Sequence, residues 1–568
     1  MRYLLRPAPL FVLASYLLLS LVPCVPLLLG RPAPDLGALL GLQVLLWIAV
    51  WGVFQRPAWF HWLLLPALLG LPTELYLFLY YGQGISTHHL GIIAESSPVE
   101  AMEFLGNKIW LMAAVLTASL AWWAAVFMAA RRSPVLTWRG KTRWLAAPAI
   151  AALAALGWPT PTPLFEHAPF TFNNFANSWP FGLTARGVDF YQERRYLAEL
   201  AERSSNFTFK AQQAAADDTP EIVIMVLGES SRYDRWGING YARDTTPLLR
   251  QEPNLVSLAD VITAVSATRL SVPVIISRKP AMQSLKAGFS EKSLLTAYKE
   301  AGFKTWWLSN QISFGEFDTP VSVFAKEADV LQFMNLGSFN NRSNLDQILL
   351  GPLQQAIHDP STKKLIVLHT LGSHWNYSER YPQQFDQWKP SLFGVDKPEH
   401  TDIAIKQELN NSYDNAILYT DWLLAQVIGQ LKDSGQRSAM LYVADHGQVL
   451  YDGSCKIAFH GHNTQYDFHV PALVWYSDQY LEHYPDKIKQ LKRLRKARLS
   501  TENMFHSLLD LGDIRYDDQQ LAWSFLSRQF KPHKRYVDSY GWTNYDNATF
   551  KGDCREVIDR GTPLKREK

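Results

Sequence analysis

Long apolar runs fill the first 160 positions of the chain, and shorter apolar runs separated by polar segments fill the rest. Helices need roughly 20 apolar residues to cross about 30 Å of hydrocarbon. Five runs qualify, the last of them shorter: Ala8–Gly30, Leu36–Phe54, Trp59–Tyr81, Ile109–Ala130 and Trp144–Trp158. Because more runs follow the first, it is expected to remain as an anchor and not to be removed as a signal peptide. The pattern predicts a five-helix transmembrane domain at residues 1–158.

After Pro220 short β-rich apolar runs alternate with helical stretches, which is typical of a mostly parallel sheet flanked by helices. The predicted strands are Glu221–Leu227, Lys304–Leu308, Lys364–Leu368, Ala439–Ala444 and Ala472–Tyr476. Polar residues directly follow four of these strands. Ligands bind outside the carboxyl ends of strands in such sheets, so these polar residues are expected to meet at one edge. Residues 221–568 are predicted to form the catalytic domain.

The segment between the two domains, residues 159–220, is rich in aromatic residues, which prefer membrane interfaces. These residues are Phe165, Phe170, Phe172, Phe175, Trp179 and Phe181. Tyr191–Arg203 is predicted to form an amphipathic helix, and the polar stretch Ala211–Pro220 a flexible joint. We interpret the segment as a bridge that lies on the outer leaflet, followed by a linker.

Charge separates the two halves and orients the first one. The 568 residues include 55 Lys and Arg and 52 Asp and Glu, a net charge of +3, which argues against a nucleic-acid binder. With the N-terminus in the cytoplasm, eight basic residues fall on inside segments and two on outside segments before the fifth run. By the positive-inside rule, everything after about residue 160 is expected on the outer side.

Three cysteines exclude a disulfide-stapled scaffold.

Glu74 lies inside the third apolar run. An intramembrane carboxylate is a functional candidate by default, here as a contact for a lipid headgroup. The alternative, which we favour from the sequence, is that Glu74 lies near the outer interface in contact with water.

Metal-ligating side chains occur at the strand ends and in the loops after them. Asp445 and His446 follow one strand and Glu229 another, and His374 and His460 lie in glycine-containing loops. Carboxylate and imidazole together suit a metal such as zinc. His462 and His469 are interpreted as surface histidines whose hydrogen bonds are satisfied, and not as ligands.

A hydroxyl-rich segment, Ser266 to Pro273, offers a nucleophile. Serine and threonine hydroxyls are weak nucleophiles at their free pKa, and coordination to a metal activates them. Spacing alone leaves Ser266, Thr268 and Ser271 open as the attacking group.

Six motifs in order resemble the membrane-bound phosphoethanolamine transferases, which have the alkaline-phosphatase/sulfatase fold. The motifs are Val226-Leu227-Gly228-Glu229-Ser230-Ser231-Arg232, Asn239-Gly240-Tyr241-Ala242-Arg243-Asp244-Thr245-Thr246-Pro247, Thr268-Arg269-Leu270-Ser271-Val272-Pro273, Gly372-Ser373-His374, Ser412-Tyr413-Asp414-Asn415-Ala416-Ile417-Leu418-Tyr419-Thr420-Asp421 and Ala444-Asp445-His446-Gly447. The resemblance covers nearly the whole chain, including the five predicted spans.

The resemblance implies roles for individual residues. The positions that match the family's zinc ligands are Glu229, Thr268, Asp445 and His446, with Thr268 also the nucleophile. His374 and His460 match histidines that contact the transferred phosphate or a second zinc ion, and Asn310 matches a polar group beside that phosphate. One zinc ion is expected, and the number beyond one is open.

The implied reaction moves phosphoethanolamine from phosphatidylethanolamine, through a covalent threonine intermediate, to lipopolysaccharide or another envelope glycan. The expected protein is a monomer in the bacterial inner membrane with its catalytic domain in the periplasm. Phosphoglycerol transfer by the same fold and a non-catalytic receptor for lipid headgroups are the alternatives. A sulfatase is disfavoured, because no Cys/Ser-x-Pro-x-Arg signature surrounds Thr268.

Two departures from the family pattern bear on the acceptor. The nucleophile segment is flanked by Ala264 and Val274 where lipid A-modifying relatives commonly carry cysteines, and Gln311-Ile312-Ser313 follows Asn310 without the lysine often found there. The sparse cysteines favour a branch other than the lipid A one. Whether Cys455 and Cys554 pair in an oxidising periplasm is open.

Overall fold

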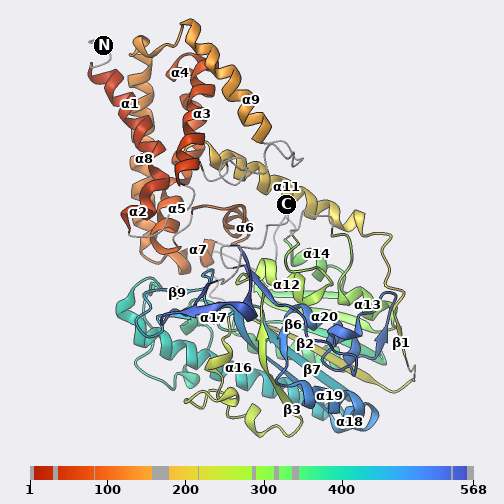
Figure 1. Cartoon of the computed structure of the whole chain (residues 1–568). Coiled ribbons are helices and arrows are strands. Elements are labelled where there is room, and N and C mark those ends of the chain that lie inside the picture. The colour runs from red at the N-terminus through yellow and green to blue at the C-terminus, as the bar shows by residue number, and fades with distance from the viewer. Residues whose placement is uncertain are drawn as a thin grey trace. The chain divides into compact units, whose positions relative to one another are not determined.

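The computed structural model describes residues 6–29, 36–81, 84–96, 98–156, 175, 178–214, 217–283, 289–312, 319–335, 344–538 and 541–558. The chain forms two compact units (Figure 1). The first combines Met1–Ser96 with Asn107–Gln192, and the second combines Ser97–Gly106 with Glu193–Lys568.

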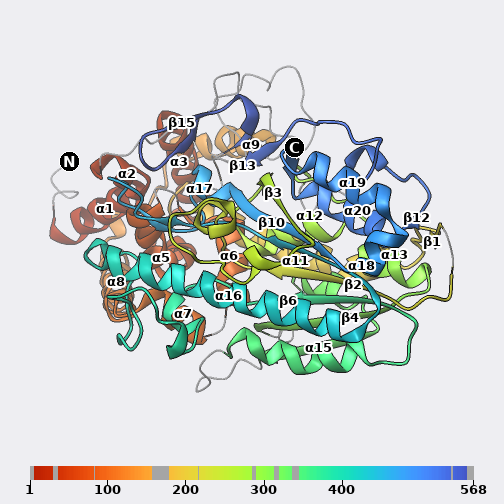
Figure 2. The same cartoon turned by 90° about the horizontal axis from the view of Figure 1, so that it is seen from below.

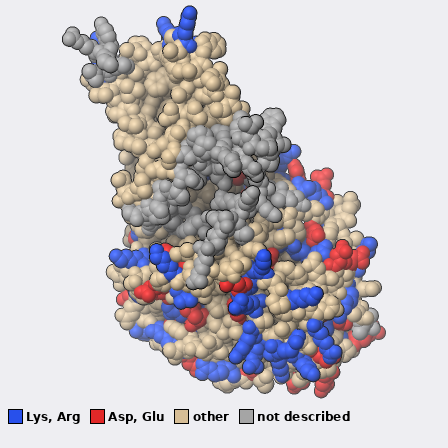
Figure 3. Space-filling model, viewed as in Figure 1, with Lys and Arg blue, Asp and Glu red and all other residues tan. Residues whose placement is uncertain are grey.

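The first unit is helical. Its α-helices are α1 (Pro7–Ser20), α2 (Val25–Leu28), α3 (Leu36–Phe54), α4 (Pro57–Phe60), α5 (Leu65–Tyr81), α6 (Thr87–Glu95), α8 (Lys108–Arg131) and α9 (Ala146–Leu156). On the face in Figure 3, few charged side chains interrupt this unit.

Helices lie in all five predicted spans, but fewer than five of these helices are long and apolar enough to cross a membrane. Within the described ranges, Pro57–Tyr80 and Lys108–Arg131 qualify. A third span is added if the bent pair Pro7–Ser20 and Val22–Leu28 is one span. Leu39–Phe54 is a shorter apolar helix, and the fifth predicted span runs past the described residues after Leu156. The structure supports two or three spans, and the predicted five are not confirmed.

Glu74 is buried, with 1% of its surface exposed, so the interpretation that it contacts water is wrong. Its Oε2 accepts hydrogen bonds from Arg186 Nη1 at 3.2 Å and from the Ile85 backbone N–H at 2.7 Å. Arg186 is also buried. The carboxylate is retained inside the first unit because a guanidinium from the same unit compensates its charge.

Part of the predicted aromatic bridge packs inside the first unit. Trp179 and Phe181 are buried in its hydrophobic core, at 0% and 8% exposure. Phe165, Phe170 and Phe172 lie outside the described residues. The predicted helix at Tyr191–Arg203 is the second half of a longer helix, α11 (Gly182–Arg203).

The second unit is built on an eight-stranded sheet, and the prediction of a mostly parallel α/β sheet is confirmed. From edge to edge its order is β11 (Arg498–Ser500), β3 (Leu255–Ile262), β10 (His469–Tyr476), β7 (Arg437–Ala444), β2 (Glu221–Gly228), β6 (Lys363–His369), β4 (Lys304–Ile312) and β5 (Val330–Asn335). All five predicted strands are present. The sheet also contains β3, β5 and β11, which were not predicted, and β10 runs antiparallel to both neighbours.

Helices cover both faces of this sheet (Figure 2). On one face lie α15 (Leu350–Ile357) and α16 (Lys406–Ser434), and on the other α12 (Thr268–Ile276), α13 (Leu294–Glu300) and α20 (Glu502–Leu511). Every residue of β2 and β7 is buried. Such unbroken burial explains why these strands read as continuous apolar runs and not as alternating ones.

Shorter elements complete the second unit. They are α7 (Pro98–Leu105), α14 (Ser322–Ala325), α17 (Gln465–Phe468), α18 (Asp478–His483), α19 (Pro485–Leu494), β1 (Gln212–Gln213), β8 (Val449–Leu450), β9 (Ala458–Phe459), β12 (Ile514–Arg515), β13 (Tyr536–Asp538), β14 (Trp542–Asn544), β15 (Thr549–Lys551) and β16 (Glu556–Ile558).

Candidate metal centre

The register of two neighbouring strands places two carboxylates side by side. In the parallel pair β2 and β7, Gly228 lies opposite Ala444. The next residues, Glu229 and Asp445, therefore leave the same edge of the sheet together, and both are 1% exposed. Neighbouring parallel strands thus bring together two carboxylates that lie 216 positions apart in sequence.

A glycine lets a third strand's loop approach them closely. Gly372, in the loop after β6, has φ of +49°, and a Cβ there would lie 2.7 Å from the backbone oxygen of Glu229. Any side chain at this position would both strain the backbone and collide with the strand end. Gly372 therefore allows the His374 loop to pack against Glu229.

Glu229, Asp445 and His446 form a buried cluster whose ligand atoms all lie within 4.8 Å of one another. His446 Nε2 lies 3.4 Å from Glu229 Oε1 and 3.6 Å from Asp445 Oδ2. The other ring nitrogen, Nδ1, lies 2.9 Å from the Gly447 carbonyl oxygen. Donation from Nδ1–H to that carbonyl turns Nε2 toward the cluster, where it can bind a metal ion that replaces its proton.

The electrostatics of the cluster suit a cation. Burial and the nearby Glu229 carboxylate raise the pKa of Asp445 to about 7. Burial opposes ionisation of His446, but the carboxylates of Asp445 and Glu229 raise its pKa to about 10. In the part of the chain that the structure describes, Asp445 Oδ2 is buried without a hydrogen-bond partner. A divalent ion would satisfy that oxygen and both negative charges, so the residues fit a metal.

Among the three candidate hydroxyls, Thr268 contacts the cluster. It is the first residue of α12, after Ala267 as N-cap. Its Oγ1 donates to Glu229 Oε2 at 3.0 Å and lies 3.4 Å from His446 Nε2. Ser266 Oγ instead accepts from the Gly461 backbone N–H, and Ser271 Oγ lies 3.5 Å from the Thr268 carbonyl. The alternatives that spacing left open are distinguished by these contacts.

His460 and His374 lie beside the cluster. The His460 ring centroid is 4.3 Å from that of His446 and 6.4 Å from that of His374. Burial, with His446 and His374 nearby, holds the pKa of His460 well below its usual range, so its ring is neutral. His374 Nδ1 lies 2.7 Å from the Trp375 carbonyl oxygen. These imidazoles can contact a group bound at the cluster.

His462 and His469 make structural contacts, but His462 is 6% exposed and therefore buried, so the prediction of a surface position is wrong for it. His462 Nε2 lies 3.2 Å from the Ala458 carbonyl, and His469 stacks on Tyr233 with ring centroids 4.3 Å apart.

Asn310 bonds to the surrounding loops, whereas its neighbour Gln311 contacts the cluster. The Asn310 amide nitrogen donates to Asp346 and to the Asn344 carbonyl, both at 2.9 Å, so these bonds support the loops around the site. Sequence reasoning missed Gln311, whose Nε2 donates to Glu229 Oε2 at 3.2 Å and to the Thr370 carbonyl at 2.8 Å. Its position near the carboxyl end of β4 was the available signal.

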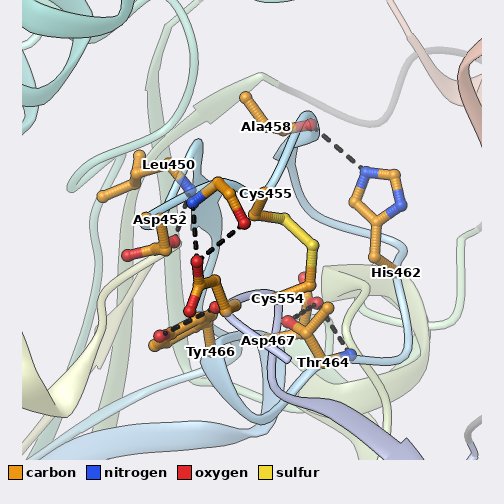
Figure 4. Close-up of a disulfide and its surroundings, with 12 residues drawn as sticks. Leu450, Asp452, Cys455, Ala458, His462, Thr464, Tyr466, Asp467 and Cys554 are labelled. Carbon is orange, nitrogen blue, oxygen red and sulfur yellow. Dashed lines mark hydrogen bonds between the residues drawn. A yellow bond between two sulfur atoms is a disulfide. The ribbon is translucent and has the colours of Figure 1, made fainter. Parts of the chain in front are cut away.

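The disulfide left open by the sequence is present: Cys455 and Cys554 are bonded, with their Cα atoms 4.9 Å apart (Figure 4). Cys24 is a free cysteine.

The fold and the buried carboxylate–imidazole cluster define a class of protein. The sulfatase family model matches residues 221–514, more than half of the chain, and the chain belongs to this family. Within it, the motifs' resemblance to the phosphoethanolamine transferases is confirmed. Phosphoethanolamine transferase EptC of Escherichia coli K12 is 27% identical over 494 residues, which cover 81% of each chain. The Kdo(2)-lipid A phosphoethanolamine 7''-transferase of the same strain is 33% identical over 307 residues, 52% of this chain and 51% of that one.

Two solved structures are similar as well. The crystal structure of the periplasmic domain of Escherichia coli EptC in complex with Zn has a TM-score of 0.54 and 27% identity, covering 61% of this chain and 97% of that one. The integral membrane protein lipooligosaccharide phosphoethanolamine transferase A of Neisseria meningitidis has a TM-score of 0.65 and 23% identity, covering 90% and 96%. This second likeness extends the shared fold over most of the chain.

Proposed function

We propose that this protein transfers phosphoethanolamine from phosphatidylethanolamine to lipopolysaccharide or another envelope glycan, with Thr268 as the nucleophile. The observation that carries the proposal is the placement of the Thr268 hydroxyl within 3.4 Å of both Glu229 and His446. A hydroxyl aimed into a buried carboxylate–imidazole cluster is the arrangement that an activated nucleophile requires. The relatives named as phosphoethanolamine transferases support the same chemistry.

Zinc is the proposed metal, held by Glu229, Thr268, Asp445 and His446. The solved periplasmic domain of Escherichia coli EptC was crystallised in complex with Zn, which supports this choice. When bound, the ion would lower the pKa of the Thr268 hydroxyl and neutralise charge on the phosphoryl oxygens. One ion is proposed at this cluster, and His374 and His460 are the candidates for holding a second.

The chain's own residues supply orientation and phosphate contacts. Glu229 accepts the hydrogen bond of Thr268 and so fixes the direction of its oxygen, while Gln311 and Ser230 hold Glu229. Thr268 is the first residue of α12, and helix N-termini suit anions. His374 and His460 are proposed to contact the transferred phosphate.

The reaction has two balanced steps. In the first, the bond from Thr268 Oγ1 to phosphorus forms, the bond from phosphorus to the glycerol oxygen breaks, and diacylglycerol leaves carrying the proton that the threonine loses. In the second, an acceptor hydroxyl or phosphate oxygen attacks the phosphothreonine, and Thr268 regains a proton.

The first unit is proposed to anchor the enzyme in the membrane that also holds the proposed donor and acceptor. We propose five spans at the predicted segments, a position in the bacterial inner membrane, a periplasmic catalytic domain and a monomeric state. A lipid donor held in the same membrane needs no soluble carrier, which gives the anchor a physical purpose.

The test is to express the full chain in bacteria that contain either labelled phosphatidylethanolamine or labelled phosphatidylglycerol, and to analyse envelope glycolipids by mass spectrometry. A phosphoethanolamine-sized mass shift that carries the ethanolamine label, and is lost in Thr268→Ala, is expected. Transfer of the glycerol label instead would identify a phosphoglycerol transferase. The absence of any mass shift and of modified Thr268 would favour a non-catalytic receptor.

A further inference from the structure

The hairpin formed by β15 and β16, near the C-terminus, holds the loop that carries His460. We call Gly453–Gln465 the His460 loop. It contains β9 and runs from just after Asp452 to the start of α17. The hairpin contacts this loop at two places, one on each side of His460.

The first contact is covalent and polar. The Cys455–Cys554 disulfide joins the start of the loop to the turn of the hairpin (Figure 4). Beside it, Asp553 Oδ2 accepts from the Ser454 backbone N–H at 2.9 Å and from Ser454 Oγ at 2.7 Å. Gly453 packs so closely that a Cβ there would lie 2.7 Å from the Asp553 carboxylate.

The second contact is a pair of backbone hydrogen bonds beyond His460. The Gln465 N–H donates to the Arg555 carbonyl, and the Val557 N–H donates to the Asn463 carbonyl, both at 2.9 Å. Thr464 and Glu556 form an antiparallel bridge between them. Asn463 to Gln465 are therefore held by the same hairpin that holds Cys455.

His460 lies between the two contacts, five residues after Cys455 and three before Asn463. Its ring stacks on Phe459 with centroids 4.1 Å apart, and Gly461 donates its N–H to Ser266 Oγ at 3.2 Å. A segment this short that is held at both ends has few backbone conformations available. If the two contacts were lost, holding His460 in one position would cost additional conformational entropy. The position of the His460 ring beside His446 thus depends on the hairpin.

We propose that the β15–β16 hairpin positions His460, with Cys455, Cys554 and Asp553 as positioning residues. We call the two contacts between the hairpin and the His460 loop the clamp. This inference rests on the proposed function, because it takes His460 as a contact of the transferred phosphate. Loss of the clamp is expected to lower kcat while leaving the Glu229, Asp445 and His446 cluster able to bind zinc. Misplacement of a catalytic contact by about 1 Å can cost about 100-fold in rate.

The experiment compares full-length protein in detergent carrying Cys455→Ser with Cys554→Ser, or Asp553→Asn, against His460→Ala and the wild type. Cys24→Ser is the matched cysteine control and Asp433→Asn the matched carboxylate control, since Cys24 lies in the other unit and Asp433 is exposed on α16. Three quantities are measured: kcat and KM for labelled phosphatidylethanolamine, bound zinc, and the rate of trypsin cleavage after the exposed Lys456.

We expect the double cysteine variant to lose about tenfold or more in kcat, to keep its zinc and to be cleaved faster after Lys456. Combined with His460→Ala, it should add little further loss, since both changes act through one residue. Full kcat in both clamp variants, or a loss that multiplies with that of His460→Ala, would overturn the proposal. A wild type that transfers nothing would instead count against the proposed function, and trypsin cleavage at an unchanged rate would then still refute the clamp.

Asp553→Asn tests the proposal independently, in case the double cysteine variant does not fold. It keeps the disulfide and removes only the charge that accepts two hydrogen bonds from Ser454. A smaller loss of kcat in the same direction is expected, and Asp553→Glu should restore part of it.

Discussion

The hydroxyl of Thr268 lies 3.0 Å from Oε2 of Glu229, although the two residues come from a helix start and a strand end 39 positions apart in sequence. The hydrogen bond joins the proposed nucleophile to the proposed metal ligands. It is also the contact that distinguishes Thr268 from the nearby Ser266 and Ser271.

Replacing Thr268 by alanine should abolish transfer, with a loss of at least about 10³-fold, because it removes the candidate hydroxyl that contacts both Glu229 and His446. The matched control is Ser271→Ala, which removes a hydroxyl from the same helix and should stay within about twofold of wild type. Mass spectrometry of the protein incubated with donor lipid should find phosphoethanolamine on Thr268. Modification of Ser266 or Ser271 in its place would disprove the assignment.

Asp445→Asn should lose bound zinc. The Asp445 carboxylate is buried, and its Oδ2 lacks a hydrogen-bond partner in the described structure, so an amide there cannot replace the missing negative charge. Zinc per chain, measured by atomic emission, should fall at least about tenfold at matched free zinc. Chelation of the wild type should abolish transfer and added zinc should restore it. Unchanged zinc content in Asp445→Asn would place the metal elsewhere.

Glu193→Gln should slow the reaction without removing the metal. Arg269, the residue after Thr268, donates from Nη2 to Glu193 Oε1 at 2.8 Å, and both side chains are buried. Removing the charge of Glu193 weakens a buried ion pair of Arg269 and loosens the start of α12. We expect kcat to fall about tenfold, with KM and zinc content little changed.

The control for this prediction lies on the same helix. Glu199 pairs with Arg195 at 2.7 Å, but both are solvent-exposed. Since exposed ion pairs contribute about 0–1 kcal/mol, Glu199→Gln should behave as wild type. Equal changes in kcat for Glu193→Gln and Glu199→Gln would show that the buried Glu193–Arg269 pair contributes no more to the reaction than an exposed pair.

Asp421 should make the protein less stable as pH rises. It is buried on α16 and accepts the backbone N–H groups of Leu248 and Leu249, and burial raises its pKa to about 7 from an ordinary 3.8. The folded chain keeps this proton where the unfolded chain releases it, so the contribution is full below about pH 4 and is lost as pH rises through 7. The loss is at most about 4 kcal/mol over the window, at about 1.4 kcal/mol per pKa unit.

Melting temperatures of the full chain between pH 5 and 8 check this prediction. The wild type should melt at lower temperature as pH rises, and the slope should be smaller in Asp421→Asn than in Asp433→Asn, the exposed carboxylate on the same helix. Equal slopes in the two variants would contradict it.

Arg186→Ala should destabilise the membrane unit, because it leaves the Glu74 carboxylate buried without its cation. Removing one partner of a buried pair costs about 3–5 kcal/mol, whereas replacing both by apolar groups is often nearly neutral. The melting temperature should therefore fall in Arg186→Ala and recover in Glu74→Leu combined with Arg186→Met. A double variant no more stable than the single one would show that the pair is not what holds Glu74.

Much of the fold followed from local pattern. Buried strands such as β2 and β7 carry unbroken apolar runs, so their positions were predictable from composition alone. Short or partly exposed strands were missed: β11 has three residues, and β5 has only one buried position. The direction of β10 was also beyond reach, because a strand's apolar pattern is the same in either orientation.

Some residues of the candidate site were likewise predictable from the sequence, and others were not. Residue types and strand-end positions identified Glu229, Asp445 and His446, because parallel strands end at a common edge. The position of Gln311 near the carboxyl end of β4 was predictable, but the contact of its side chain with Glu229 depends on packing and was not.

The sequence by itself determined where the apolar runs lie, which of them become buried strands such as β2 and β7, and which residue types can hold a metal, because these follow from local periodicity and side-chain chemistry. Only the tertiary structure decided the partners of Glu74, the hydroxyl that faces the cluster, the pairing of Cys455 with Cys554, and the hold of the C-terminal hairpin on the His460 loop. Each of these joins residues far apart in the chain, and such contacts depend on how whole elements pack, which no local pattern records.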